Sequence, residues 1–209
     1  MTDEVFSRRA GEYDRWYDRH AAAYRSELAA VRRALPRTGR GLEVGVGTGR
    51  FAAPLGIAEG IDPAGNMLAL ARRRGVKVRR GRGEALPYGD GEFDYVAIIV
   101  TLCFVADPPA VLREARRVLK PGGTLVAAVI DRESELGRRA RVKQSPFYHG
   151  ARFFSVPELR GLLKEAGFTD MTAWQTLTGP PDAAAEPEPP RRGTGRGGFV
   201  VLRARARAR

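Results

Sequence analysis

Glycines and a carboxylate stand together in the stretch LEVGVGTGR, residues 42–50. Glycines at positions 45, 47 and 49 can adopt positive φ and let backbone N–H groups approach a ligand closely. The stretch differs from the G-x-G-x-x-G loop of dinucleotide sites, because its third glycine follows the second by only two residues. Glu43 precedes the loop, where a pyrophosphate would meet negative charge. The stretch therefore favours a ligand that carries a cation.

A second stretch, GIDPAG, places Asp62 at the end of a predicted strand. In open α/β sheets ligands bind at the carboxyl ends of the strands, where an acid commonly accepts hydrogen bonds from ribose hydroxyls. Asp62 could also cap the helix predicted to follow, and both roles can hold together. A ribose and a cation without phosphates describe S-adenosylmethionine. The two stretches together predict a site for this cofactor.

A sheet must bring these stretches to one place. Apolar residues recur at three- and four-residue spacings through residues 4–35, which predicts one helix that Pro36 ends. Beyond it, short apolar strands alternate with amphipathic helices, which is typical of a mostly parallel sheet covered on both faces. The predicted strands lie near 41–45, 58–62, 76–80, 93–100, 123–130, 168–177 and 199–202, and the predicted helices near 50–56, 64–74, 108–119 and 156–166.

The order of the motifs resembles the class I S-adenosylmethionine-dependent methyltransferases of the small type-11 group, which includes quinone C-methyltransferases. The motifs through residues 40–175 are LEVGVGTGRF, GIDPAGNML, GEALPYGDGEFDYV, DPPAVLREARRVLKPGG and RFFSVPELRGLLKEAGF. The resemblance implies an α/β fold with a single Rossmann-like domain. Its sheet would have seven strands, mostly parallel with an antiparallel last strand, and helices on both faces.

The resemblance also implies which residues touch the cofactor. Those around its methionine part would be Glu43, Gly45, Gly47 and Thr48. Asp62 would hold the ribose, and Ile99 would lie beside the sulfonium. Tyr13 is expected to contact the cofactor as well, because the family often has a Tyr-Asp pair at this place, as in Tyr13-Asp14.

The adenine contact departs from the family pattern. Where the family often has Asp-Ala before Glu-Ala-Leu-Pro, this chain has Arg82-Gly83 before Glu84. A guanidinium has no acceptor, so Arg82 cannot bind the adenine amino group through its side chain. Either Glu84 accepts that hydrogen bond, or backbone groups of Arg82 and Gly83 read the ring. The backbone of Gly83 is the favoured contact.

The segment after the fifth predicted strand contains side chains that could act on the methyl acceptor. Displacement at a methyl sulfonium needs mainly orientation of the acceptor, and a general base helps when the acceptor must lose a proton. His149 and Tyr148 are the predicted catalytic residues for that role. Together with aromatic residues of the N-terminal helix, this segment predicts a capped pocket for a small, partly aromatic or anionic acceptor.

The sequence predicts one methyltransferase domain over residues 1–209. Residues 179–198 are rich in Pro, Gly and Ala, which predicts a loop without packed elements. The predicted parts are an N-terminal helical cap (1–36), a cofactor-binding core (40–131), a lid (132–154), a mobile loop (179–198) and a basic tail (203–209).

The net charge of +12 raises an alternative, an RNA-directed methyltransferase or an RNA-binding protein that uses the Arg-rich tail. Seven arginines and no acid lie in residues 191–209. A solvated basic surface explains this charge more simply, so a small-molecule acceptor is favoured over nucleic acid. A nicotinamide dehydrogenase ranks third, because the chain lacks a Tyr-x-x-x-Lys pair.

Composition also argues against a membrane-spanning protein and against a disulfide-bonded one. No apolar run approaches the roughly 20 residues that a membrane helix needs. The lone Cys103 permits no internal disulfide and fits a reducing cytoplasm. The expected reaction uses S-adenosylmethionine, yields S-adenosylhomocysteine and needs no metal.

Overall fold

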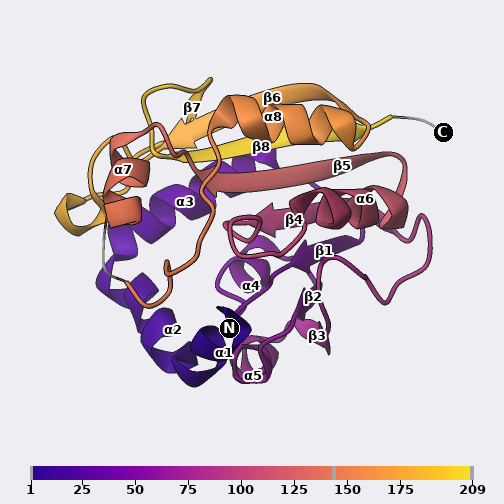
Figure 1. Ribbon diagram of the computed structural model, residues 1–209, viewed down its shortest axis with the longest axis horizontal. Coiled ribbons are helices and arrows are strands. Elements are labelled where there is room, and N and C mark those ends of the chain that lie inside the picture. The colour runs from indigo at the N-terminus through magenta and orange to yellow at the C-terminus, as the bar shows by residue number, and fades with distance from the viewer. Residues whose placement is uncertain (1, 143–144, 208–209) are drawn as a thin grey trace.

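One sheet runs through the computed structural model, which describes residues 2–142 and 145–207 (Figure 1). In these residues the sheet has eight strands. Their spatial order is β3 (Lys77–Arg80), β2 (Glu59–Asp62), β1 (Gly41–Val44), β4 (Phe93–Ile99), β5 (Leu119–Ile130), β8 (Phe199–Ala206), β6 (Phe168–Thr176) and β7 (Arg191–Arg192). The first five are parallel, and β8 runs antiparallel to both of its neighbours.

The strand order reverses between β1 and β4, and this reversal positions the site. Val44 on β1 pairs with Ile61 on β2 and with Ile98 on β4. The carboxyl ends of these three strands therefore meet at one edge of the sheet. A ligand crevice is expected outside such a switch point.

Helices cover both faces, as the sequence predicts. Helices α6 (Pro108–Val118) and α8 (Val156–Glu165) pack on one face, and α3 (Ala21–Ala34), α4 (Ala52–Leu55) and α5 (Gly65–Arg73) pack on the other (Figure 1). Asp107 caps α6 through its side chain, since its Oδ1 accepts from the Ala110 N–H at 2.9 Å. The predicted fold class is confirmed.

The prediction of one N-terminal helix is wrong. The structure has α1 (Thr2–Arg8), α2 (Ala10–Arg19) and α3, with breaks at Arg9 and His20. At His20 the imidazole Nδ1 lies 2.8 Å from the Trp16 carbonyl oxygen, and Nε2 lies 2.6 Å from Asp182 Oδ1. The second partner lies 162 residues away in sequence, so this contact at the break is one that helix periodicity cannot predict.

The loop 179–198 contains structure that the sequence does not predict. It includes the 3-10 helix η1 (Pro181–Ala183) and the strand β7, which pairs with β6 and makes the eighth strand. Glu188 anchors it, because its backbone N–H donates to Ser26 Oγ at 2.7 Å and its carboxylate accepts from the Thr178 N–H at 2.8 Å. Helix α7 (Glu135–Val142) is a further element missed from the sequence.

Several predicted parts reach beyond the described residues. Met1 of the predicted cap, residues 143–144 of the predicted lid and residues 208–209 of the predicted tail lie outside them. Most of the rest of the tail is the end of β8, which continues to Ala206. Within the described chain, no helix is both long and apolar enough to cross a membrane.

Candidate functional site

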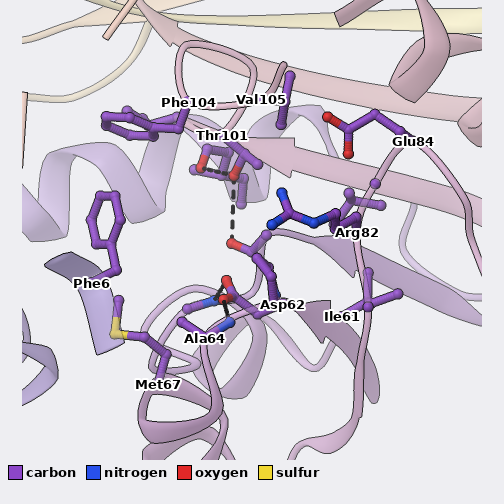
Figure 2. Close-up of a pocket in the computed structure, with 18 of the residues that line it drawn as sticks. Phe6, Ile61, Asp62, Ala64, Met67, Arg82, Glu84, Thr101, Phe104 and Val105 are labelled. Atoms are coloured by element: carbon purple, nitrogen blue, oxygen red, sulfur yellow. Dashed lines mark hydrogen bonds between the residues drawn. The ribbon is translucent and has the colours of Figure 1, made fainter. Parts of the chain in front are cut away.

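A cavity with an empty volume of about 720 Å³ opens at the carboxyl ends of β1, β2 and β4. Phe6 and Met67 lie on one side of it and Arg82 and Glu84 on the other, with Asp62 between them (Figure 2). The lining residues are Phe6, Tyr13, Val44, Gly45, Gly47, Ile61, Asp62, Pro63, Ala64, Met67, Gly81, Arg82, Gly83, Glu84, Ile99, Val100, Thr101, Phe104 and Val105. We call this space the strand-end cavity.

The glycine loop follows β1 and forms the floor of the strand-end cavity. Gly45 has φ +74°, and a Cβ there would overlap the side chain of Thr101. Thr101 Oγ1 donates to the Ile99 carbonyl oxygen at 3.0 Å. Glycine is therefore required at position 45 for two separate reasons, the positive φ and the close approach of Thr101.

Asp62 connects two elements at the end of β2. Its Oδ2 accepts from the Gly47 N–H at 3.0 Å, and its Oδ1 accepts from the Ala64 N–H at 2.8 Å. The N-cap of α5 is Ala64, so Asp62 does not cap this helix. Each carboxylate oxygen can accept more than one hydrogen bond, so these bonds orient the group toward the cavity and are compatible with a hydroxyl donor.

Two of the residues expected around the cofactor are buried. Glu43 is 2% exposed and Thr48 is 1% exposed, and neither lines the cavity. Burial raises the pKa of Glu43 well above its ordinary value, and its Oε2 has no hydrogen-bond partner among the described residues. A direct contact of either side chain with a ligand stays a prediction.

The segment after β3 forms the wall predicted to hold adenine. Gly83 packs so closely that an added Cβ would lie 2.9 Å from Val44 Cγ1. Glu84 Oε1 accepts from the backbone N–H of Ala106 at 3.0 Å, so part of its capacity is used to hold the following loop. The guanidinium of Arg82 points into the cavity (Figure 2), a placement that the sequence does not predict.

Ion pairs fix helix α2 on the glycine loop. Arg50 binds Asp14 at 2.8 Å and Asp18 at 2.7 Å, and Arg74 binds Asp14 at 2.8 Å. Burial opposes the charge of Asp14, but hydrogen bonds from Arg50 and Arg74 outweigh it and lower its pKa to about 2. The Arg that follows the glycines therefore holds the helix that carries Tyr13.

A second cavity, of about 780 Å³ empty volume, adjoins the first. Tyr13 and Val100 line both cavities, and the Tyr13 hydroxyl is 2.7 Å from that of Tyr17. The lining residues are Glu12, Tyr13, Trp16, Tyr17, Arg19, Glu27, Phe51, Val100, Ile130, Leu136, Ser145, Phe147, Tyr148 and Pro181. We call this space the aromatic cavity.

Val100 stands between the two cavities in a strained conformation. It follows β4 with φ +49°, and its N–H donates to the Ala128 carbonyl oxygen at 2.8 Å. A positive φ is unusual for a β-branched residue and costs on the order of 1–3 kcal/mol. Such outliers gather at functional sites, and this one lies where a cofactor and an acceptor would meet.

The two predicted catalytic residues, Tyr148 and His149, lie in different environments. Tyr148 lines the aromatic cavity, where burial raises the pKa of its hydroxyl and makes a phenolate less accessible near neutral pH. His149 is exposed and lines neither cavity, because its neighbour Tyr148 takes the inward position. The structure thus does not bring His149 to the site.

Glu27 is a site residue that the sequence analysis missed. It lies on α3 among the buried residues Ala23, Ala30, Val31 and Ala34, at helical spacing. It is 7% exposed, lines the aromatic cavity, and has a pKa raised to about 8 by burial. An acid inside the apolar stripe of a helix is the signal that could have found it.

The strand-end cavity fits S-adenosylmethionine. Backbone groups of the glycine loop suit the amino-acid part of the cofactor, and the Asp62 carboxylate suits its ribose. Ile99, Met67 and Phe104 provide apolar walls for its adenine ring. No group of three or more His, Cys, Asp or Glu in the described ranges is placed to hold a metal ion.

Comparisons with known proteins agree with this geometry. The sequence pattern of a methyltransferase domain matches residues 42–127. A crystal structure from Thermotoga maritima, described as a SAM-dependent methyltransferase and possible histamine N-methyltransferase, is 47% identical. It superposes with a TM-score of 0.95 over 98% of this chain and 99% of that chain.

Three relatives are similar to this chain in sequence, and one of them is a named methyltransferase. An uncharacterized protein of Methanocaldococcus jannaschii is 44% identical over 96% of this chain and 98% of its own length. A demethylmenaquinone methyltransferase of Roseiflexus castenholzii is 31% identical over 81% of this chain and 86% of its own length. An uncharacterized Mycobacterium tuberculosis protein is 42% identical over 85% of this chain, which spans 64% of that relative's length.

Proposed function

Since this chain belongs to the class I S-adenosylmethionine-dependent methyltransferases of the type-11 group, we propose that it methylates a small molecule bound in the aromatic cavity. The observation that carries the proposal is the junction of the two cavities at Tyr13 and Val100. A cofactor in the strand-end cavity and an acceptor in the aromatic cavity would meet there.

The residues proposed to hold the cofactor surround the strand-end cavity. Asp62 would bind the ribose hydroxyls, and Gly45 and Gly47 would offer backbone groups to the methionine part. Gly83 and Glu84 would border adenine, and Ile99 the sulfonium, with Tyr13 closing the cavity from α2. The cofactor supplies an electrophilic methyl group with a good leaving group.

The protein's own contribution is orientation and exclusion of water. Tyr13, Tyr17 and Phe147 pack edge to face around the junction, with ring centroids 5.4 Å and 5.6 Å apart. Holding the acceptor atom in line with the methyl group can supply up to roughly 7–11 kcal/mol of the barrier reduction. Apolar walls around the junction favour transfer to the acceptor over side reactions.

A nucleic acid acceptor is not favoured. The arginines of β8 that belong to the Arg-rich region, Arg203 and Arg205, line a separate groove near β6 and β7. None of the residues lining that groove lines either of the two adjoining cavities. An RNA docked on this basic surface would have no evident path to the junction.

Calorimetry with S-adenosylhomocysteine tests the cofactor assignment. We expect binding to the wild type and a loss of about 1.5–3 kcal/mol in Asp62→Ala, because a hydrogen bond to a charged group is removed. Asp90→Ala, on a surface turn where Asp90 pairs with Arg117 at 2.9 Å, serves as the control and should bind normally. Equal affinity of Asp62→Ala and wild type would overturn the ribose role. Binding of NADH without S-adenosylhomocysteine would overturn the proposed function.

A further inference from the structure

The aromatic cavity combines rings with one deeply buried acid. Helix α3 contributes the carboxyl of Glu27 to a wall that is otherwise formed largely by rings. The rings belong to Tyr13, Trp16, Tyr17, Phe51, Phe147 and Tyr148. The side chains of this cavity therefore indicate the chemical class of the acceptor, which the fold alone does not indicate.

Glu27 lacks a partner within the protein. Of the groups in residues 2–142 and 145–207, none forms a hydrogen bond or an ion pair with its carboxyl, although it is 93% buried. A buried carboxylate without a partner is costly, because removing its hydration is not repaid. Its position at a cavity wall suits a ligand that brings a positive charge or a proton.

We propose that the aromatic cavity takes a small primary or secondary amine, which Glu27 binds as the ammonium and from which Glu27 accepts the proton before methyl transfer. This inference rests on the function proposed above. The aromatic side chains of the cavity wall add attraction for a cation that lies over a ring face.

Other acceptor classes fit this wall less well. An anionic acceptor, which the sequence analysis allows, would face the carboxylate of Glu27 in a cavity of low polarity, where like charges repel strongly. A neutral alcohol or phenol would not stabilise the charged form of Glu27, whose pKa burial raises to about 8. An ammonium ion compensates it and presents the nucleophilic nitrogen in the same group.

The reaction balances with the cofactor as the only co-reactant. The ammonium R–NH3+ gives one proton to a carboxylate oxygen of Glu27, which frees the nitrogen lone pair. That pair forms the new N–C bond to the methyl carbon as the C–S bond breaks, and the electrons of the C–S bond stay on sulfur. The products are the methylammonium R–NH2+–CH3 and S-adenosylhomocysteine, and Glu27 later releases its proton to solvent.

The ionisation of Glu27 suits this exchange. Burial raises its pKa to about 8, and a bound ammonium would lower this pKa and favour the carboxylate. A base whose pKa lies near the working pH accepts a proton most effectively. The tyrosine hydroxyls nearby have pKa values that burial raises further, so they stay neutral. The ionisable groups that interact electrostatically with Glu27 are Tyr13, Tyr17, Tyr24 and Tyr148, of which all but Tyr24 line the cavity. Glu12 and the exposed Arg19 also belong to the lining.

Three matched probes test the class of ligand. Calorimetry at saturating S-adenosylhomocysteine compares 2-phenylethylamine, 2-phenylethanol and 3-phenylpropanoate, which share a ring and differ in the charge of the terminal group. We expect the amine to bind about tenfold or more tightly than the other two. In Glu27→Gln, which keeps the side-chain shape, this preference should disappear while S-adenosylhomocysteine affinity stays within about twofold. Glu59→Gln, whose side chain is 16% exposed and pairs with Arg40, is the control and should keep the preference.

Methyl transfer to the amine tests the proton step. Glu27→Gln should lower kcat by about 100-fold or more at neutral pH and recover part of it at high pH, where the amine arrives without its proton. If the alcohol or the carboxylate binds as well as the amine, or if Glu27→Gln keeps the amine preference, the inference is wrong. A failure of the wild type to bind S-adenosylhomocysteine would instead reject the proposed function itself.

Discussion

The two adjoining cavities differ in whether backbone groups or side chains form most of their walls. Strand ends and backbone groups form the strand-end cavity, whose glycine loop fits between Thr101 and Asp62. Side chains of α2 and α3, together with Leu136, Ser145, Phe147 and Tyr148, form much of the aromatic cavity, where Tyr13 packs on the rings of Tyr17 and Phe147. A site made by the backbone tolerates little change, whereas a site made by side chains can change its ligand without changing the fold.

The boundary between the cavities has features of both. Val100 belongs to the sheet by its hydrogen bond to Ala128 and is strained in its backbone, while Tyr13 reaches the junction from a helix held by ion pairs. The strand-end cavity and the aromatic cavity thus share one strand end and one helix. Changes on either side should stay local unless they touch these two residues.

The largest effect is expected where backbone packing is tightest. Gly45→Ala would force a Cβ into the side chain of Thr101 at a positive φ, so the loop must move. We expect S-adenosylhomocysteine affinity to fall by about 100-fold or more, because the loop amides lose their positions. The matched control is Gly56→Ala, which has φ +73° but no atom within 4 Å of the added Cβ. A similar affinity loss in both variants would show that φ strain alone, without the overlap at Thr101, explains the effect.

The next effect concerns stability and the acid of the aromatic cavity. Because the folded-state pKa of Glu27 is about 8, above the unfolded value, the unfolded chain loses this proton first as pH rises. Stability should therefore fall between about pH 4.5 and 8, by on the order of 3 kcal/mol for a group facing a cavity. Glu27→Gln should remove this decline, so the variant is more stable than wild type at pH 8 and similar at pH 4.5. Parallel stability–pH curves from denaturant unfolding would contradict it.

The sequence predicts the strand-end cavity well because its determinants are local. The glycines, Asp62 and the strands they follow can be recognised from spacing and alternation within short windows. The aromatic cavity depends on contacts between distant segments. At the bend between α2 and α3, His20 contacts Asp182 from a distant segment, and the placement of Tyr148 rather than His149 toward the cavity depends on how the segment turns.

Glu27 and Val100 show two further limits. The acid in the apolar stripe of α3 could have been recognised from helical spacing alone. The positive φ of Val100 has no sequence signal, because neighbouring structure imposes it on a residue that disfavours it. The sequence therefore predicts where the cofactor would bind and leaves the acceptor to the structure.

A smaller effect is expected at the ion pairs that hold helix α2, which carries Tyr13, on the glycine loop. Asp14→Asn removes the charge that Arg50 and Arg74 share, and should lower stability by about 1–2 kcal/mol and S-adenosylhomocysteine affinity severalfold. Since the folded-state pKa of Asp14 is about 2, its contribution is present above the unfolded pKa and is lost as pH falls from about 4 to 2. Asp18→Asn is the control on the same helix, because that side chain is 61% exposed and should contribute little. If Asp14→Asn and Asp18→Asn lose equal stability, the ion pair between Asp14 and Arg74 does not make the main contribution to stability.

The smallest effects are expected on the adenine wall, where this chain departs from the family pattern. If backbone groups of Arg82 and Gly83 read the adenine, then Arg82→Ala should change S-adenosylhomocysteine affinity by less than about threefold. Glu84→Gln should be equally mild, because the amide oxygen can still accept from the Ala106 N–H as the carboxylate does at 3.0 Å. Glu84→Ala would remove that acceptor and should loosen the loop after β4, with a moderate loss of affinity. Calorimetry on the three variants separates the cases. A large loss in Glu84→Gln with Arg82→Ala unchanged would show that the Glu84 carboxylate itself binds the adenine amino group, and that this wall, like the aromatic cavity, depends on a side chain.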